Sequence, residues 1–80
     1  MNKAYKIVVL SCDVHVLAER HLYGELVAVK RQATRDLHKY KGLQVYVYQM
    51  DGDETYPYET LVAKRCQDFP KHPGFWVSML

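Results

Sequence analysis

The side chains in this sequence that could act as nucleophiles or metal ligands are two cysteines and four histidines. Cys12 lies close to Asp13 and His15, and a thiol beside an oriented imidazole is an arrangement used in nucleophilic catalysis. In a strand, however, neighbouring side chains point to opposite faces, so this spacing does not by itself form a catalytic site. The sequence therefore predicts a protein that is not an enzyme.

Sites for metals, phosphates and cofactors also lack their usual spacing. Cys12 and Cys66 do not form a Cys-x-x-Cys pair, and no two histidines form a His-x-x-x-His pair. The acidic segment 51–54 lacks the regular alternation of acids found in a calcium-binding loop, so it predicts a polar turn. The four glycines are isolated, which excludes a glycine-rich phosphate loop. We expect neither a metal ion nor a cofactor.

Anion binding is the chemistry that the segment from Arg20 to Lys41 indicates. The segment has six Lys and Arg residues against two acids, and three basic side chains lie within about 60° of one another on a helical wheel. Such a stripe can bind phosphates, dock on an acidic protein surface or simply face solvent. The net charge of the chain is only +2, which is low for a dedicated nucleic-acid binder. The candidate partner-binding cations are Lys30, Arg31, Arg35, His38, Lys39 and Lys41.

Tyrosine is the other unusual feature, with seven residues in the chain and four of them between positions 46 and 58. Tyrosine forms strands readily, and it also supplies rigid contact area at binding surfaces or stacks on bases. Because Asp51-Gly52 favours a two-residue turn, we expect one pair of these tyrosines in the core and the other exposed. Tyr46 and Tyr48 are candidate partner-binding residues.

Two elements precede the central helix of the sequence. Ala4 to Leu10 is rich in β-branched residues and predicts a strand with at least one buried face. Ser11 to Gly24 is ambiguous, because its apolar residues fit either a helix behind a cap at Asp13 or an alternating strand. The strand or an extended segment is the favoured reading.

Apolar spacing predicts an amphipathic helix from Glu25 to Lys41. An acid in the first turn and lysines in the last turn suit the helix dipole, and Gly42 is placed to take the left-handed conformation that ends the helix. Residues 43–50 and 55–66 then predict a hairpin, in which Pro57 requires an edge or a bulge. Residues 67–74 predict a loop, and residues 75–80 a short strand or a cover over the core.

These elements define an α+β protein with a single domain, residues 1–80, in which a small antiparallel sheet of three to four strands is covered on one face by one principal amphipathic helix. The hydrophobic content of 49% is enough for one compact core and leaves little room for a large cofactor. We expect the core to include Ile7, Val9, Leu26, Val29, Ala33, Leu37, Val45, Val47, Leu61 and Trp76.

The expected location is the cytoplasm. Only four consecutive apolar residues precede Ser11, whereas a secretory signal needs roughly 7 to 15. No segment approaches the roughly 20 apolar residues that span a bilayer, so no membrane partner is expected. Two cysteines without a short spacing fit a reduced chain.

A chain with these features most resembles a binding module that occupies a surface of a larger protein or nucleoprotein complex. In size and style the chain is similar to accessory proteins of phages and mobile elements, including anti-CRISPR inhibitors of bacterial defence systems, although no residue motif carries this likeness. The alternative is a small nucleic-acid-binding regulator that uses the basic helix. A homodimer is also plausible, because small sheets leave edges that pair between copies.

Overall fold

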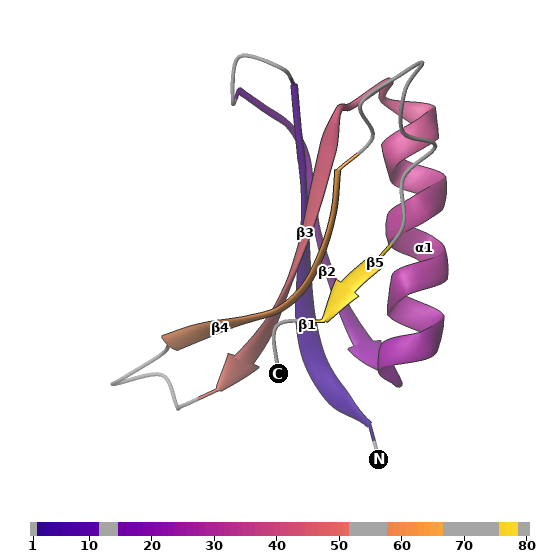
Figure 1. Cartoon of the computed structure of the whole chain (residues 1–80). Coiled ribbons are helices and arrows are strands. Elements are labelled where there is room, and N and C mark those ends of the chain that lie inside the picture. Colours follow the sequence, from indigo (N-terminus) through magenta and orange to yellow (C-terminus); the bar gives the residue numbers. More distant parts are fainter. Residues whose placement is uncertain (1, 12–14, 52–57, 67–75, 79–80) are drawn as a thin grey trace.

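The computed structural model describes residues 2–11, 15–51, 58–66 and 76–78. Along the chain these residues form β1 (Lys3–Leu10), β2 (Val16–Gly24), α1 (Leu26–Lys39), β3 (Gln44–Asp51), β4 (Tyr58–Cys66) and β5 (Trp76–Ser78) (Figure 1). The predicted α+β class is confirmed, as is the strand interpretation of the segment before α1. The sheet has five strands rather than three to four, because residues 16–24 and 76–78 both pair within it.

The sheet is antiparallel throughout, with the strand order β2-β1-β3-β4-β5. β2 and β3 both pair with β1, so the connection between them must cross β1, and α1 makes that crossing. Figure 1 shows α1 running along one side of the sheet. The chain therefore places one helix on one sheet face, and the described residues provide no second helix for the other.

One buried cluster joins side chains of α1, β1, β3 and β4. Val29, Ala33 and Leu37 recur every four residues on α1 and are at most 2% exposed. Residues of odd number in β1 and β3 contribute from the sheet, because alternate side chains of a strand share a face. Leu26 and Trp76, predicted for the core, are partly buried against its margin. The strand members of the cluster are Tyr5, Ile7, Val9, Val45, Val47, Val62 and Ala63.

A β-bulge in β4 corrects one predicted core residue. Tyr48 lies opposite Leu61, but Val47 lies opposite Ala63, so Val62 is an extra residue in this strand. A bulge lets two neighbouring residues oppose one partner, and Val62 and Ala63 are both buried in the cluster. Leu61, predicted for the core, is instead half-buried on the opposite face with Tyr48. Strict alternation along β4 cannot anticipate this shift.

The end of α1 also differs from the prediction. The helix ends at Lys39, and the left-handed residue is Lys41, with φ 53°, rather than Gly42. The amide of Gly42 donates to the carbonyl of Leu37 at 2.9 Å, and the amide of Lys41 donates to the carbonyl of His38 at 3.3 Å. This pair of bonds is the Schellman arrangement, in which the left-handed residue usually is glycine. At the other end, Glu25 occupies the N-cap position without a side-chain hydrogen bond to the helix.

Gly42 is required for close packing rather than for a left-handed turn. A Cβ atom at this position would lie 3.2 Å from the Leu37 Cδ1 atom and from the Leu10 carbonyl oxygen, and closer still to Val9 Cγ1. The backbone at Gly42 therefore passes directly against β1 and the last turn of α1. Only a residue without a side chain allows this approach.

The hairpin between β3 and β4 is confirmed, but Asp51 is a residue of β3 rather than part of the expected Asp51-Gly52 turn. Met50 pairs with Glu59, and the last described pair is Asp51 with Tyr58. The predicted start of the second strand at Thr55, the turn residues after Asp51 and the loop over 67–74 lie outside the described residues. Pro57 has no N–H to donate, which favours a ladder that begins after it.

A buried ion pair attaches α1 to β2. Asp36 is 2% exposed and accepts hydrogen bonds from Arg20 Nε at 2.7 Å and from Gln32 Nε2 at 3.0 Å. Arg20 Nη2 lies 3.3 Å from the second carboxylate oxygen. The hydrogen bond and the negative charge of Asp36 raise the pKa of Arg20, whose side chain remains 39% exposed. Asp36 is the acid of α1, so the helix directs its negative charge toward the sheet.

We predict that Gly42→Ala lowers the free energy of unfolding by about 1–3 kcal/mol, because the new methyl group overpacks the contact with β1 and Leu37. Urea unfolding followed by circular dichroism measures the change. Gly24→Ala is the matched control, since a Cβ atom there meets nothing within 4 Å. Equal stability of the two variants would contradict the packing role of Gly42.

Asp36→Ala should lower the free energy of unfolding by about 2 kcal/mol, because it removes charge-assisted hydrogen bonds and leaves Arg20 without its partner. The exposed part of Arg20 limits the loss, since water reaches the guanidinium group. Arg35→Ala, at an exposed position one residue away, should change stability by less than about 0.5 kcal/mol. Similar unfolding midpoints for both variants would show that the ion pair is not stabilising.

Candidate functional site

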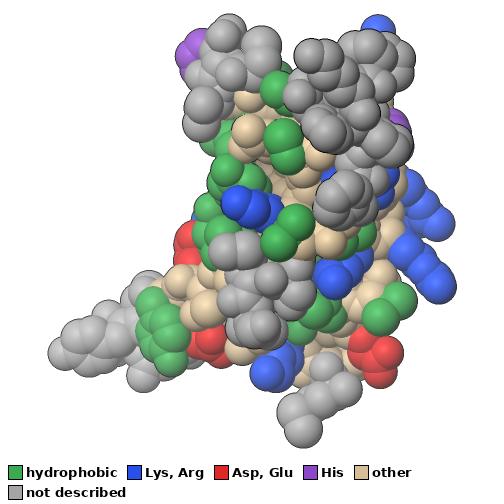
Figure 2. Space-filling model, viewed as in Figure 1, with side chains coloured by type: hydrophobic (Ala, Val, Ile, Leu, Met, Phe, Trp, Pro, Cys, Tyr) green, Lys and Arg blue, Asp and Glu red, His purple; other side chains and the backbone are tan. Residues whose placement is uncertain are grey.

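The predicted cations lie together on the side of α1 that faces solvent and just beyond its end. We call this set, Lys30, Arg31, Arg35, His38, Lys39 and Lys41, the basic helix face. All of its members except the half-buried Lys30 are exposed. In Figure 2 blue side chains project from the right-hand side of the molecule, where α1 lies. The helical periodicity in the sequence therefore predicted that these side chains share the outer side of α1, while their role in partner binding stays a prediction.

Aromatic contacts hold two lysines of this surface in place. The ammonium group of Lys30 lies 5.7 Å from the ring centroid of Trp76, and that of Lys39 lies 5.3 Å from the ring centroid of Tyr40. Both distances fall in the range of cation–π attraction. This attraction orients the lysines and leaves their positive charge unneutralised.

Carboxylates of the described residues form no ion pair with the cations of the basic helix face. Among the described residues, the ion pairs join Lys6 to Glu19 and Glu59, and Arg20 to Asp36. None of these pairs uses a cation of the basic helix face. Because Asp36 points inward and is neutralised by Arg20, α1 presents a positive surface to solvent.

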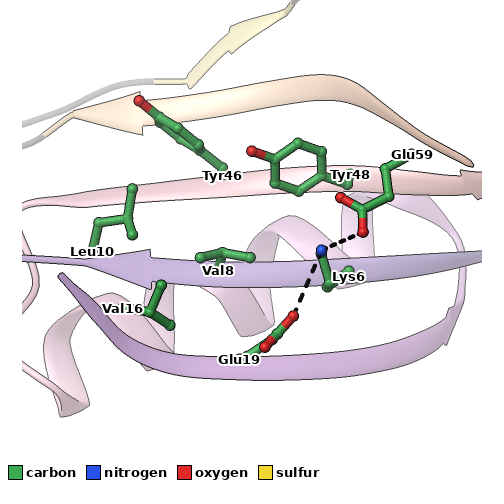
Figure 3. Close-up of a pocket in the computed structure, with 8 residues that line it drawn as sticks. All are labelled: Lys6, Val8, Leu10, Val16, Glu19, Tyr46, Tyr48 and Glu59. Atoms are coloured by element: carbon green, nitrogen blue, oxygen red, sulfur yellow. Dashed lines mark hydrogen bonds and ion pairs between the residues drawn. The ribbon is translucent and has the colours of Figure 1, made fainter. Parts of the chain in front are cut away.

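The opposite side of the sheet carries a second candidate surface, which we call the open sheet face. It contains a shallow hollow of about 420 Å³ (Figure 3). The floor is apolar, because Val8 and Leu10 of β1 are only 9% and 6% exposed. The remaining lining residues are Lys6, Val16, Glu19, Tyr46, Tyr48 and Glu59.

Lys6 organises the charges of the open sheet face. Its Nζ atom donates to Glu59 Oε1, lies 3.6 Å from Glu19 Oε1, and is 5.1 Å from the ring centroid of Tyr48. These contacts connect β1 with β2, β3 and β4 across the sheet (Figure 3). The hydrogen bond to Glu59 raises the pKa of Lys6 despite its burial, and burial raises the pKa of the Tyr48 phenol. The charged groups that line the hollow thus pair with one another within the protein.

The tyrosine prediction is correct in part. Tyr46 and Tyr48 share the open sheet face, and their ring centroids lie 6.3 Å apart with an interplanar angle of 71°. Tyr58 pairs with Asp51, which is three residues after Tyr48 in β3 and therefore lies on the opposite face of the sheet. Tyr58 thus belongs to that other face, and Tyr56 lies outside the described residues. The expected core pair is wrong, because Tyr46 and Tyr48 are half-buried and Tyr58 is 58% exposed. No helix of the described residues covers the open sheet face and completes their burial.

The structure separates the two groups of predicted site residues. The cations of the basic helix face belong to α1 and the residues just after it, on one side of the sheet, whereas Tyr46 and Tyr48 project from the sheet face that α1 does not cover (Figures 1 and 3). One flat or short ligand therefore cannot contact both groups together. The remaining residues of the hollow, Lys6 and Glu59 above all, were not predicted. The sequence does contain one indication of this surface. The run from Ile7 to Leu10 is apolar on both faces of a strand, so side chains must cover it on both faces.

Cysteine and metal chemistry gain no support in the part of the chain that the structure describes. Cys66 is a free, exposed thiol, and Cys12 with Asp13 lies outside the described residues. No group of three potential metal ligands forms among residues 2–11, 15–51, 58–66 and 76–78. Within the same ranges, no helix has both the length and the apolar character needed to span a bilayer.

Comparison of the chain with protein-family models, with curated proteins and with solved structures gives no significant match. A function for this protein must therefore be argued from its two surfaces.

Alkaline pH should destabilise the fold through Lys6 and Tyr48. Both pKa values are raised on folding, so their contribution is present below the ordinary values of 10.5 and 10.0 and is lost as pH rises through the folded values. Thermal unfolding measured upward from about pH 9 tests this. Lys6→Met and Tyr48→Phe should each flatten the loss of stability above pH 10, with Tyr58→Phe as the exposed control. Parallel profiles for all variants would contradict this assignment.

Proposed function

We propose that this protein is a non-enzymatic binding module that occupies an anionic surface of a larger protein or nucleoprotein complex through its basic helix face. The observation that carries the proposal is the row of exposed cations that form no ion pair with a carboxylate of the described residues, above an acid that is turned inward. Complementary charge increases association rates and selects partners. A helix attached to a sheet presents these charges in a rigid arrangement.

The dimensions of the surface suit a groove or an extended acidic patch. From Lys30 to Lys39 the helix rises about 14 Å at 1.5 Å per residue. Arg31 and Arg35, four residues apart, stand near its centre on the same side. Their planar guanidinium groups bind carboxylates and phosphates in a bidentate manner, so we assign them the central contacts.

Within this class, an inhibitor of a bacterial defence complex is the specification that we favour. Such an inhibitor would compete for, or attach beside, the channel that receives nucleic acid. Support comes from the small size of the chain and from a cationic surface on a rigid helix.

Direct binding to nucleic acid is the alternative, because the same cations can neutralise phosphates. The placement of the tyrosines weighs against a combined mode of phosphate contact and base stacking, since Tyr46 and Tyr48 lie on the other side of the sheet. The hydroxyl group of Tyr46 also donates to Gln44 Oε1 at 2.9 Å. We therefore rank the protein or nucleoprotein partner first.

An affinity capture from lysate separates these two functions. The tagged protein is incubated with lysate, with and without nuclease, and the bound protein and nucleic acid are identified. Stoichiometric protein partners that survive nuclease would support the first function. Nucleic acid alone, lost at raised salt, would support the alternative instead.

Neutralising the centre of the basic helix face should weaken partner binding. We expect Arg31→Gln with Arg35→Gln to reduce the affinity for the captured partner at least about tenfold, because two bidentate cations are lost. Lys3→Glu changes the net charge by the same two units at an exposed site on β1 and serves as the matched control. Titration by calorimetry measures both. If the two variants bind equally well, the basic helix face is not the interface.

A further inference from the structure

β2 is a long strand at an edge of the sheet. It pairs with β1 on one side only, and its nine residues contrast with the three of β5 at the other edge. A long edge strand presents unpaired backbone N–H and C=O groups to another strand. Among the described elements, β2 therefore offers the more extended template for strand addition.

Exposed apolar side chains also concentrate on this edge. Val16, Leu17 and Tyr23 are 60%, 41% and 74% exposed, and they make up three of the seven exposed large hydrophobic residues in the described part of the chain. They stand near the two ends of β2, with charged residues between them. An apolar group at each end of a strand is the distribution that an antiparallel copy of the same strand would cover.

We propose that β2 pairs antiparallel with β2 of a second copy of this chain, with Arg20 of each copy on the two-fold axis. In this register Glu19 lies opposite His21 of the second copy, and Ala18 lies opposite Leu22. Both pairs occur twice, because the axis relates them. The strand is thus complementary to itself in hydrogen bonding and in size, since the carboxylate of Glu19 can accept a hydrogen bond from the imidazole of His21, and this is the argument for a second copy as the occupant.

Neighbouring registers lose this complementarity. A shift of two residues in one direction places Glu19 opposite Glu19, and a shift in the other places His21 opposite His21. A shift by one residue would put side chains from opposite sheet faces together. Two carboxylates directly opposite each other destabilise a sheet, and two imidazoles offer no carboxylate acceptor, whereas a carboxylate opposite an imidazole can accept its N–H, so the register centred on Arg20 is preferred.

Local contacts in each copy are compatible with this register. Arg20 is neutralised by Asp36 of its own chain, so the two Arg20 side chains meet as ion pairs rather than as free cations. The carboxylate of Glu19 is 48% exposed beside Lys6 and remains accessible to a second partner. The irregularity in the β1–β2 register lies between Ala18 and Val16, so residues 18–22 belong to the regular ladder.

Such pairing would join two five-stranded sheets into one continuous sheet. The two-fold axis would be perpendicular to the sheet, so both copies of α1 would lie on the same face of the dimer. Both basic helix faces would then point to the same side. The dimer interface does not depend on the proposed function, because it uses β2 and none of the cations of α1.

Sedimentation equilibrium over a wide concentration range tests the interface. We expect the wild-type chain to form a concentration-dependent dimer and His21→Glu to weaken it at least about tenfold, because carboxylates would then face each other twice. The double variant Glu19→His with His21→Glu again places a carboxylate opposite an imidazole in both cross-strand pairs, so it should recover most of the affinity for the dimer. His38→Glu makes the same chemical change on α1 and should leave the dimer unchanged.

A second measurement uses only the wild-type chain, so its result does not depend on whether a variant folds. In the wild-type chain, amide exchange of β2 should slow as the protein concentration rises, at every second residue between 18 and 22, while exchange in α1 stays constant. A monomer at all concentrations would overturn the proposal. A dimer that His21→Glu does not weaken, or whose β2 exchange is independent of concentration, would overturn it as well.

Discussion

The fold depends on how β1 is covered. β1 is the strand on which β2 and β3 both pair, and its residues from Ile7 to Leu10 are apolar on both faces. The helix α1 covers the face that carries Ile7 and Val9, which are fully buried. The face with Val8 and Leu10 must be covered by side chains of its own sheet, and the tyrosines of β3 and the charges around Lys6 provide that cover. The open sheet face is therefore first a solution to a packing constraint.

Attachment of the helix and the charge of its outer surface are linked through one residue. Asp36 is buried against Arg20 of β2, so the ion pair that connects α1 to the sheet also removes the negative charge of α1 from solvent. If Asp36 pointed to solvent instead, its negative charge would partly neutralise the row of cations from Lys30 to Lys39. A stabilising contact and a cationic surface thus arise from the same placement, because a helix has two sides and each charge must lie on one of them.

Much of the fold was predictable from local patterns. Helical spacing located α1 and the side that enters the core, and strand propensity located β1, β3 and most of β4. The errors share a cause, which is that a tertiary contact overrode a local preference. The bulge at Val62 follows from pairing with β3, and the position of Gly42 follows from its approach to Val9 and Leu37. Neither contact can be predicted from the residues next to Val62 or Gly42 in the sequence, because the partners in β3 and β1 lie far away along the chain.

For the candidate surfaces, the sequence alone determined that a cationic stripe lies along one side of a helix, since the 3.6-residue period is a local property. It also determined that Tyr46 and Tyr48 share a face, because the period of a strand is two. Only the tertiary structure decided that these two groups lie on opposite sides of the sheet and that Asp36 is withdrawn from the helix surface. It alone also placed β2 at the edge. The physical reason is that strand order and helix placement depend on contacts between residues far apart in the chain, and no local period encodes them.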